Sequence, residues 1–330
     1  MNDSGQTVAA EIYPWLDGHW SFFTHCLEVD RLAHALLVEG PAGCGKTALA
    51  NAMVARLLCT ENKLYACGCC KSCELLAGGA HPEYFEATFE INPKTGKLRT
   101  VIAVEQVRRM IAALQLTNSI SSRKVACIFP ADSMHWSAAN AILKSLEEPT
   151  GDTVLILVTD SPGKLPVTIR SRCQAIHVSQ PDGEVVLDWL EHGSNKPLEE
   201  LHAALQAAGG SPLRAMQYLD SPELDGYTRV RDGLATLLVR PASVSKVSAQ
   251  LGDLNPVELW RWLSMCTGDA LKSSMTGSPL DWLAPNRRLK DKTLLQLQQQ
   301  ADFNRRLSAT PIRGDLLLQD WLIRWAEQGI

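Results

Sequence analysis

Short apolar runs alternate with helical patterns over the first half of the chain. The apolar runs have the length of buried strands and lie at 35–38, 84–91, 125–128 and 154–158. The segments between them with helical character are Thr47–Leu58, Val104–Leu116 and Ser137–Leu146. Strands that alternate with helices predict an α/β fold, a parallel sheet with helices on both faces. An aromatic-rich helical pattern over Gln6–Asp30 precedes the first run.

The pattern changes near Ser179, and helical periodicity continues from there to the end of the chain. Short helices are predicted over Glu184–His192 and Leu198–Ala208, and a further one starts at Ser211-Pro212. We therefore predict three domains, which cover residues 1–178 (sheet), 179–219 (small and helical) and 220–330 (all-α).

Two local signals mark the C-terminal helices. Asn255-Pro256-Val257-Glu258 predicts a helix start with an N-cap, a proline at the first position and an acidic third position. The last helix carries one apolar stripe, which predicts domain core or a subunit interface: Leu317, Leu318, Trp321, Leu322 and Trp325.

Composition is that of an ordinary globular protein. Of 330 residues, 45% are hydrophobic and 21% charged, and the net charge is −4. The charge argues against tight autonomous binding to nucleic acid. The longest apolar run, at 154–158, is too short to span a bilayer, and we see no signal peptide. We expect a cytoplasmic protein with no membrane partner.

The segment Gly40–Thr47 reads G-x-x-x-x-G-K-T between a predicted strand and a predicted helix. Its glycines, Gly40, Gly43 and Gly45, let the backbone N–H groups face a phosphate chain. Lys46 would reach the β and γ phosphates, and the Thr47 hydroxyl would hold Mg²⁺. We therefore predict a phosphate-binding loop (P-loop) for ATP or ADP with magnesium.

Hydrolysis additionally needs an acid after the next buried strand, for Mg²⁺ and the attacking water. That strand ends at Ile128, and Phe129-Pro130 follow it, so no carboxylate stands where one is needed. Asp132 lies four residues beyond Ile128 and would take this role if the chain were an ATP-hydrolysing motor. We predict nucleotide binding without hydrolysis, with the motor as the alternative.

Five of the ten cysteines fall between residues 59 and 73. Cys67, Cys70 and Cys73 have a spacing suited to one metal ion, and Cys59 completes a four-thiolate set for tetrahedral zinc. An arrangement that uses Cys69 in place of Cys70 is open, as is a set of reduced free thiols. The other five cysteines are isolated and are expected to be small packing residues.

Several motifs occur in one order along the chain: Tyr13–Leu16, His34–Leu37, the P-loop, the cysteine segment, His81–Tyr84, Asn140–Pro149 and Leu165–Cys173. The most specific are the helix Asn-Ala-Ile-Leu-Lys-Ser-Leu-Glu-Glu-Pro at 140–149 and the tripeptide Ser171-Arg172-Cys173. Over residues 10–220 the series resembles bacterial clamp-loader subunits of the AAA+ class.

The resemblance implies an AAA+ P-loop domain with a zinc module, a helical lid and a C-terminal collar for oligomerisation. It implies a five-subunit ring with gamma/tau motor subunits and a delta subunit, which opens the sliding clamp and places it on primer-template DNA. Such a ring is part of a DNA-directed DNA polymerase holoenzyme, a nucleotidyltransferase. The family's motors carry Asp-Glu where this chain has Phe129-Pro130, so the resemblance implies a non-hydrolysing stator.

The resemblance also assigns residue roles. Arg172 matches the arginine that reaches in trans into the neighbouring subunit's nucleotide site, where a permanent positive charge stabilises the transferring phosphoryl group. Thr159 or Asp160 stands where the family senses the γ-phosphate, and Arg214 falls one residue later than its second sensor. A zinc-dependent nucleic-acid-binding module is a third interpretation, but no basic, aromatic-interleaved stretch supports it.

Overall fold

The computed structural model describes residues 12–61, 63–93, 95–240, 243–283, 289–308 and 313–329. The chain divides into two units. The sheet unit consists of the residues up to Trp189 together with Ser211–Leu213, and the helical unit consists of Leu190–Gly210 and the chain from Arg214 onwards. In the pattern predicted over 6–30, residues 6–11 lie outside the described residues, and the remainder forms a 3-10 turn, Pro14–Leu16, followed by α1.

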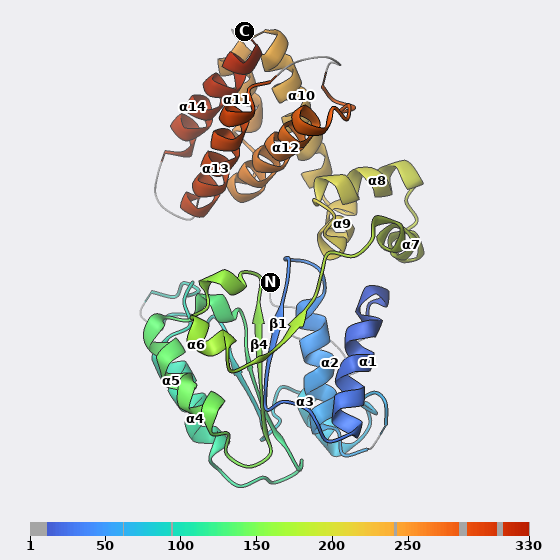
Figure 1. Cartoon of the computed structure of the whole chain (residues 1–330), viewed down its shortest axis with the longest axis vertical. Coiled ribbons are helices and arrows are strands. Elements are labelled where there is room, and N and C mark those ends of the chain that lie inside the picture. The colour runs from blue at the N-terminus through green and yellow to red at the C-terminus, as the bar shows by residue number, and fades with distance from the viewer. Residues whose placement is uncertain are drawn as a thin grey trace. The chain divides into compact units, whose positions relative to one another are not determined.

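Five strands build the sheet unit: β1 (Ala35–Glu39), β2 (Tyr84–Ala87), β3 (Lys124–Ile128), β4 (Thr153–Thr159) and β5 (Gln174–His177). They pair in parallel in the order β2-β3-β4-β1-β5. The predicted parallel sheet is therefore confirmed. Because all strands run in the same direction, their carboxyl ends lie at one edge of the sheet. The P-loop follows β1 at this edge (Figure 1).

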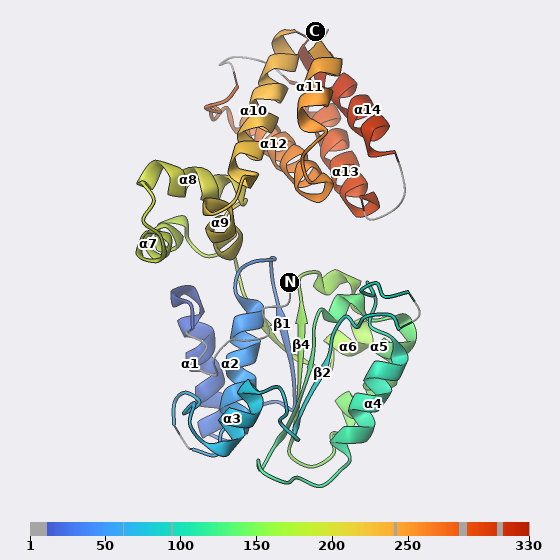
Figure 2. The ribbon, with the colours of Figure 1, turned by 180° about the vertical axis from the view of Figure 1, so that it is seen from behind.

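Helices cover both faces of this sheet: α1 (Asp17–Glu28), α2 (Lys46–Leu58) and α3 (Lys71–Ala77) lie on one face, and α4 (Val104–Leu114), α5 (Trp136–Glu147) and α6 (Val167–Arg170) on the other (Figures 1 and 2). Successive side chains of a strand point to opposite faces of the sheet, so each strand contributes side chains to two apolar cores. Leu36 and Val38 pack with α1 and α2, whereas Leu37 packs with α4 and α5. Burial on both faces explains why the strands read as continuous apolar runs.

The strand predicted over Tyr84–Ile91 is shorter than expected, since β2 ends at Ala87. Its partner β3 ends at Ile128, which pairs with Ala87, and the next residue, Phe129, donates the last hydrogen bond to the Ala87 carbonyl. Pro130 has no N–H with which to extend the ladder. The pairing partner, and not the composition of 88–91, sets the end of this strand.

The helical unit consists mainly of α8 (Leu198–Ala207), α9 (Pro212–Leu219), α10 (Glu223–Val239), α11 (Val244–Leu251), α12 (Pro256–Thr276), α13 (Asp291–Leu307) and α14 (Gly314–Ala326). Two helices cross the unit boundary: α7 (Gly183–Gly193) begins in the sheet unit, and α9 has its first two residues there. No helix within the described ranges is both long enough and apolar enough to cross a membrane.

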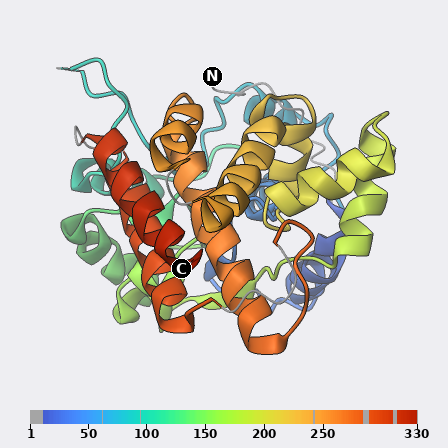
Figure 3. The same cartoon turned by 90° about the horizontal axis from the view of Figure 1, so that it is seen from above.

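The apolar stripe of α14 forms core within the helical unit. Leu318, Trp321, Leu322 and Trp325 are buried, and the rings of Trp321 and Trp325 stack with centroids 5.8 Å apart. The helices α12, α13 and α14 pack on one another in the part of the unit coloured orange to red (Figure 3). The predicted start of α12 is also confirmed, because the Asn255 side chain accepts a hydrogen bond from Val257 N–H at 2.9 Å.

Candidate nucleotide and metal sites

The P-loop joins the end of β1 to the start of α2, as its motif requires. Gly40, Gly43 and Gly45 have φ values of 147°, 75° and 87°, a region that side chains other than glycine rarely enter. A Cβ on Gly40 would lie 1.9 Å from the Val178 carbonyl oxygen, and one on Gly45 would lie 2.7 Å from the Tyr13 ring. Both glycines are therefore required by conformation and by close packing.

Within the described residues, the backbone N–H groups of Gly43, Cys44 and Gly45 have no hydrogen-bond acceptor. Unpaired N–H groups on a curled loop form a concavity that favours an anion. Lys46 is only 3% exposed, and Thr47, which follows it, is exposed at the start of α2. The loop thus offers the donors, the buried cation and the accessible hydroxyl that a nucleotide phosphate with Mg²⁺ would use.

Lys46 is engaged by groups of the chain itself. Its Nζ donates to the Pro41 carbonyl at 2.5 Å and lies 2.6 Å from Oδ1 of Asp160, which follows β4. A carboxylate therefore holds the lysine that would otherwise bind phosphate. Asp160, one of the two predicted γ-phosphate sensors, is in this structure the partner of the P-loop lysine.

Aromatic rings lie against the P-loop. Trp15 donates from Nε1 to the Cys44 carbonyl at 2.9 Å. The Tyr13 and Trp15 rings stack with centroids 5.0 Å apart, and Trp189 meets both edge-on. The backbone of Leu213 also contacts the P-loop, since its N–H donates to the Gly43 carbonyl at 3.2 Å. Sequence reasoning missed Trp189, which lies more than 140 residues from the loop and whose role depends on the fold.

The end of β3 carries no acid, as predicted. Phe129 is partly buried and packs against the core that contains α1 and α2. Asp132, the acid of the alternative motor interpretation, accepts a hydrogen bond from the fully buried Thr159 hydroxyl at 2.7 Å and lies 3.4 Å from Lys164 Nζ. Thr159, the other predicted sensor, is thus bound to Asp132.

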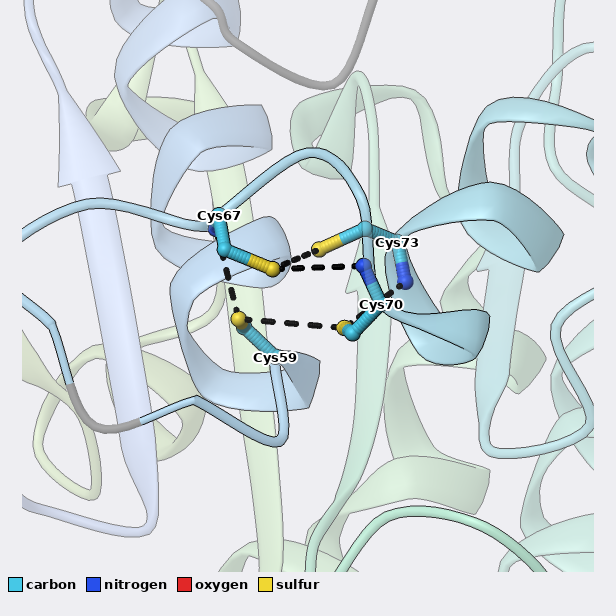
Figure 4. Close-up of side chains that lie close together, drawn as sticks. All are labelled: Cys59, Cys67, Cys70 and Cys73. Carbon is cyan, nitrogen blue, oxygen red and sulfur yellow. Dashed lines mark hydrogen bonds between the residues drawn. The ribbon is translucent and has the colours of Figure 1, made fainter.

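The structure brings Cys59, Cys67, Cys70 and Cys73 together, with all four sulfurs within 4.8 Å of one another (Figure 4). The Cys59–Cys70 and Cys67–Cys73 sulfur pairs are each 4.0 Å apart. A tetrahedral zinc ion with bonds of about 2.3 Å places its sulfurs about 3.8 Å apart, so the set fits zinc with little adjustment. Cys69 is exposed and is not part of the cluster.

Backbone N–H groups point at these sulfurs. Cys67 N–H donates to the Cys59 sulfur at 3.4 Å, and Cys70 N–H donates to the Cys67 sulfur at 3.3 Å. Burial raises the pKa of Cys70, but hydrogen bonds from Thr60 and from Cys73 N–H outweigh it and lower that pKa to about 6. At Cys70 these donors stabilise the thiolate, the form that binds metal, whereas burial raises the pKa of Cys59 and of Cys73.

Arg172 lies just before β5. The first residue of that strand, Gln174, lies beside Leu36 near the start of β1. The P-loop begins at Gly40, beyond the other end of β1 and four residues from Leu36, on the order of 13 Å away at about 3.3 Å per residue. A second contact supports this placement. His34, just before β1, lies 2.7 Å from the Leu146 carbonyl, and the next residue, Glu147, accepts a hydrogen bond from Arg172 Nε at 2.7 Å. Arg172 is therefore remote from its own chain's P-loop.

Arg214 falls in the helical unit, where it is half-buried. Burial raises the pKa of Glu258, and the hydrogen bond from Tyr218, the charge of Arg261 and, least of all, the charge of Arg214 lower it.

A P-loop after the first strand, a parallel sheet in the order β2-β3-β4-β1-β5 and a following helical region define an AAA+ protein. Comparison with known families agrees: the family described as "DNA polymerase III, delta subunit" matches residues 16–182. The chain is 35% identical to DNA polymerase III subunit delta' of Pseudomonas aeruginosa, over 96% of this chain and 98% of that one. The chain belongs to the delta' family of DNA polymerase III subunits.

Other relatives fit this assignment. The delta' subunit of Yersinia pestis is 32% identical over 95% of each chain. The tau subunit of Salmonella typhimurium is 31% identical over 69% of this chain and 33% of its own length. The clamp-loader resemblance predicted from the motifs is therefore confirmed.

Proposed function

We propose that this chain is the non-hydrolysing stator of a clamp loader. The observation that carries the proposal is the end of β3, where Phe129 and Pro130 stand in place of acids. A phenyl ring and a pyrrolidine can neither bind Mg²⁺ nor orient an attacking water. The chain itself would then catalyse nothing, although it works within a DNA-directed DNA polymerase holoenzyme.

The partners we propose are the gamma/tau motor subunits and the delta subunit of a five-subunit ring in the cytoplasm. The ring would open the sliding clamp and place it on primer-template DNA. In this scheme residues 1–178 form the AAA+ domain, 179–219 the lid and 220–330 the collar that holds the ring together.

Arg172 is the residue we propose to act in trans. It lies at the edge of the sheet where the strands begin, remote from its own P-loop, so a phosphate that it contacts would belong to a neighbouring subunit. Its guanidinium would stabilise charge on the phosphoryl group that the motor subunit transfers to water.

The P-loop would bind ATP or ADP with magnesium without turnover. The N–H groups of Gly43, Cys44 and Gly45 and the cation of Lys46 would hold the phosphates, and the Thr47 hydroxyl would reach Mg²⁺. The cysteine cluster would hold one structural zinc, because all four of its ligand positions are filled by thiolates and none is left open.

The intact P-loop also favours the alternative, a gamma/tau-like motor that uses Asp132. Steady-state ATP hydrolysis by the purified chain, alone and in the assembled ring, separates the two. We expect no turnover by the chain alone. Turnover that survives purification and is lost in Lys46→Ala would establish the motor and reject the stator.

A further inference from the structure

Four polar side chains meet in the interior between the cysteine cluster and the sheet. Ser72, His81, Glu83 and Ser121 are each at most 6% exposed. Two of them belong to His81-Pro82-Glu83, a motif that neither the P-loop nor the arginine finger explains. Buried polar groups persist only where hydrogen bonds satisfy them, so the arrangement has a structural cost that calls for a role.

The hydrogen bonds fix the direction of each donor. The hydroxyls of Ser72 and Ser121 both donate to the Leu58 carbonyl at 2.7 Å. With the Ser72 proton used, His81 Nε2, at 2.8 Å from its oxygen, must donate to it. Glu83 N–H donates to His81 Nδ1 at 3.2 Å, which requires that nitrogen to be unprotonated. One neutral tautomer of His81, with its proton on Nε2, satisfies both of these contacts of the ring.

The carboxylate of Glu83 secures the other side of the network. It accepts backbone N–H bonds from Ser119, Ile120 and Ser121 at 2.6, 3.2 and 3.3 Å. These bonds hold the loop before β3, and with it the Ser121 hydroxyl. The network therefore connects the sheet edge to the carbonyl of Leu58, the last residue of the P-loop helix α2.

Two of the anchored residues stand next to metal-ligating positions. Leu58 precedes Cys59, and Ser72 precedes Cys73. The network thus holds the backbone at two of the four cysteines, one on each side of the 60–70 segment. Each ligand fixed before binding removes conformational entropy that the ion would otherwise have to overcome.

We propose that Ser72 and His81 are positioning residues of the zinc site, which they preorganise through the Leu58 carbonyl. The proposal rests on the zinc site of the proposed function. It assigns the His-Pro-Glu motif to metal affinity, with no part in nucleotide chemistry. Supporting groups of this kind typically contribute 10–100-fold to metal affinity.

The test measures zinc affinity of the full chain by competition with a chromophoric chelator, together with thermal unfolding of the zinc-free protein. Ser72→Ala and His81→Ala should each weaken zinc binding about 10–100-fold. His81→Gln, whose amide N–H can still reach Ser72, should recover most of the affinity. Ser122→Ala, at an exposed neighbouring serine, is the matched control and should leave affinity unchanged.

The outcomes separate the two proposals. A wild-type chain that binds no zinc would reject the metal site itself, and this inference with it. A wild-type chain that binds zinc, with unchanged affinity in Ser72→Ala and His81→Ala, would overturn only the positioning role. Equal loss in His81→Ala and His81→Gln would also overturn it, as would variants that lower only the unfolding temperature, because hydrogen bonding would then not control affinity.

Discussion

Arg172 is held on its own subunit by Glu147, the first glutamate of the Leu-Glu-Glu-Pro sequence that ends α5. Arg172 Nε donates to Glu147 Oε1 at 2.7 Å, Nη2 pairs with the same oxygen, and Nη1 donates to the Thr168 carbonyl at 2.9 Å. Of the five N–H donors of a guanidinium, these contacts use three. Within the described part of the chain, one N–H on each of Nη1 and Nη2 is left for a phosphate.

Arg172→Ala should leave the fold and ring assembly intact and depress ATP hydrolysis by the neighbouring motor subunit. An arginine supplied in trans contributes about 10³–10⁵-fold at the site it faces, and less to the total of a ring with several sites. The rate of clamp loading should fall more than the total rate of ATP hydrolysis if every nucleotide site of the ring must hydrolyse ATP for loading.

The control for this variant is Arg170→Ala, at an exposed position two residues earlier, which should have a milder effect. DNA-stimulated hydrolysis and clamp loading are measured on rings shown to be complete by size-exclusion chromatography. Unchanged rates with Arg172→Ala in such rings would leave the chain only a scaffold role.

Glu147→Gln should reduce the same hydrolysis by a smaller factor. The carboxylate orders an arginine side chain whose rotamer entropy is about 2 kcal/mol, so its loss should cost at most about 30-fold. Glu148→Gln changes the adjacent exposed glutamate and should have little effect. Faster hydrolysis in Glu147→Gln would contradict this ordering role, since it would mean that Glu147 keeps Arg172 away from the neighbouring nucleotide site.

The motifs were predicted from the sequence because each is local. The P-loop and the cysteine spacing are set by neighbouring residues, and the apolar runs identified β1, β3 and β4 because both faces of these strands are buried. The contacts of Trp189 with Trp15 and of Ser121 with Ser72 join residues 174 and 49 positions apart. Such pairs depend on the order of strands in the sheet, which no local pattern encodes.

Asp160→Asn should strengthen nucleotide binding by the isolated chain. The Asp160 carboxylate competes with phosphate for Lys46, and it is 44% exposed. An ion pair that water reaches is worth about 0.2–1 kcal/mol, so the gain should not exceed about fivefold. Fluorescent ADP titration with Mg²⁺ measures it, with Lys46→Ala as the variant that loses binding. Weaker binding in Asp160→Asn would show that the acid supports the nucleotide.

Cys70→Ser should remove the zinc that the wild-type chain carries, whereas Cys69→Ser should retain about one ion per chain, the content of a single tetrahedral site. The two cysteines are adjacent, but only Cys70 has its sulfur in the cluster. Elemental analysis after gel filtration gives the ratio. Loss of zinc in Cys69→Ser with retention in Cys70→Ser would establish the other arrangement of ligands.

Arg261→Ala should destabilise the helical unit, because it removes the cation paired with the half-buried Glu258 carboxylate, and the cost of breaking a fully buried pair, about 3–5 kcal/mol, is the upper limit. Arg261 is 6% exposed. Its Nε donates to Glu258 at 2.8 Å and its Nη2 to the Ala207 carbonyl at 2.8 Å. Urea unfolding measures the loss. The double variant Arg261→Ala/Glu258→Gln should recover part of the lost stability, because no unpaired carboxylate remains. Equal destabilisation in the single and the double variant would assign the loss to packing.

The ion pair of Arg261 and Glu258 also predicts how the stability of the helical unit depends on pH. Burial raises the pKa of Glu258, but the hydrogen bond from Tyr218 and the charge of Arg261 outweigh it, so the folded pKa lies below the ordinary value. A carboxyl with a depressed pKa contributes stability that is complete above the unfolded pKa, about 4.3, and is lost as pH falls through the folded pKa. Glu258→Gln should therefore flatten the fall in urea midpoint below about pH 4.3. An unchanged slope in that variant would show that other carboxyls control the acid response.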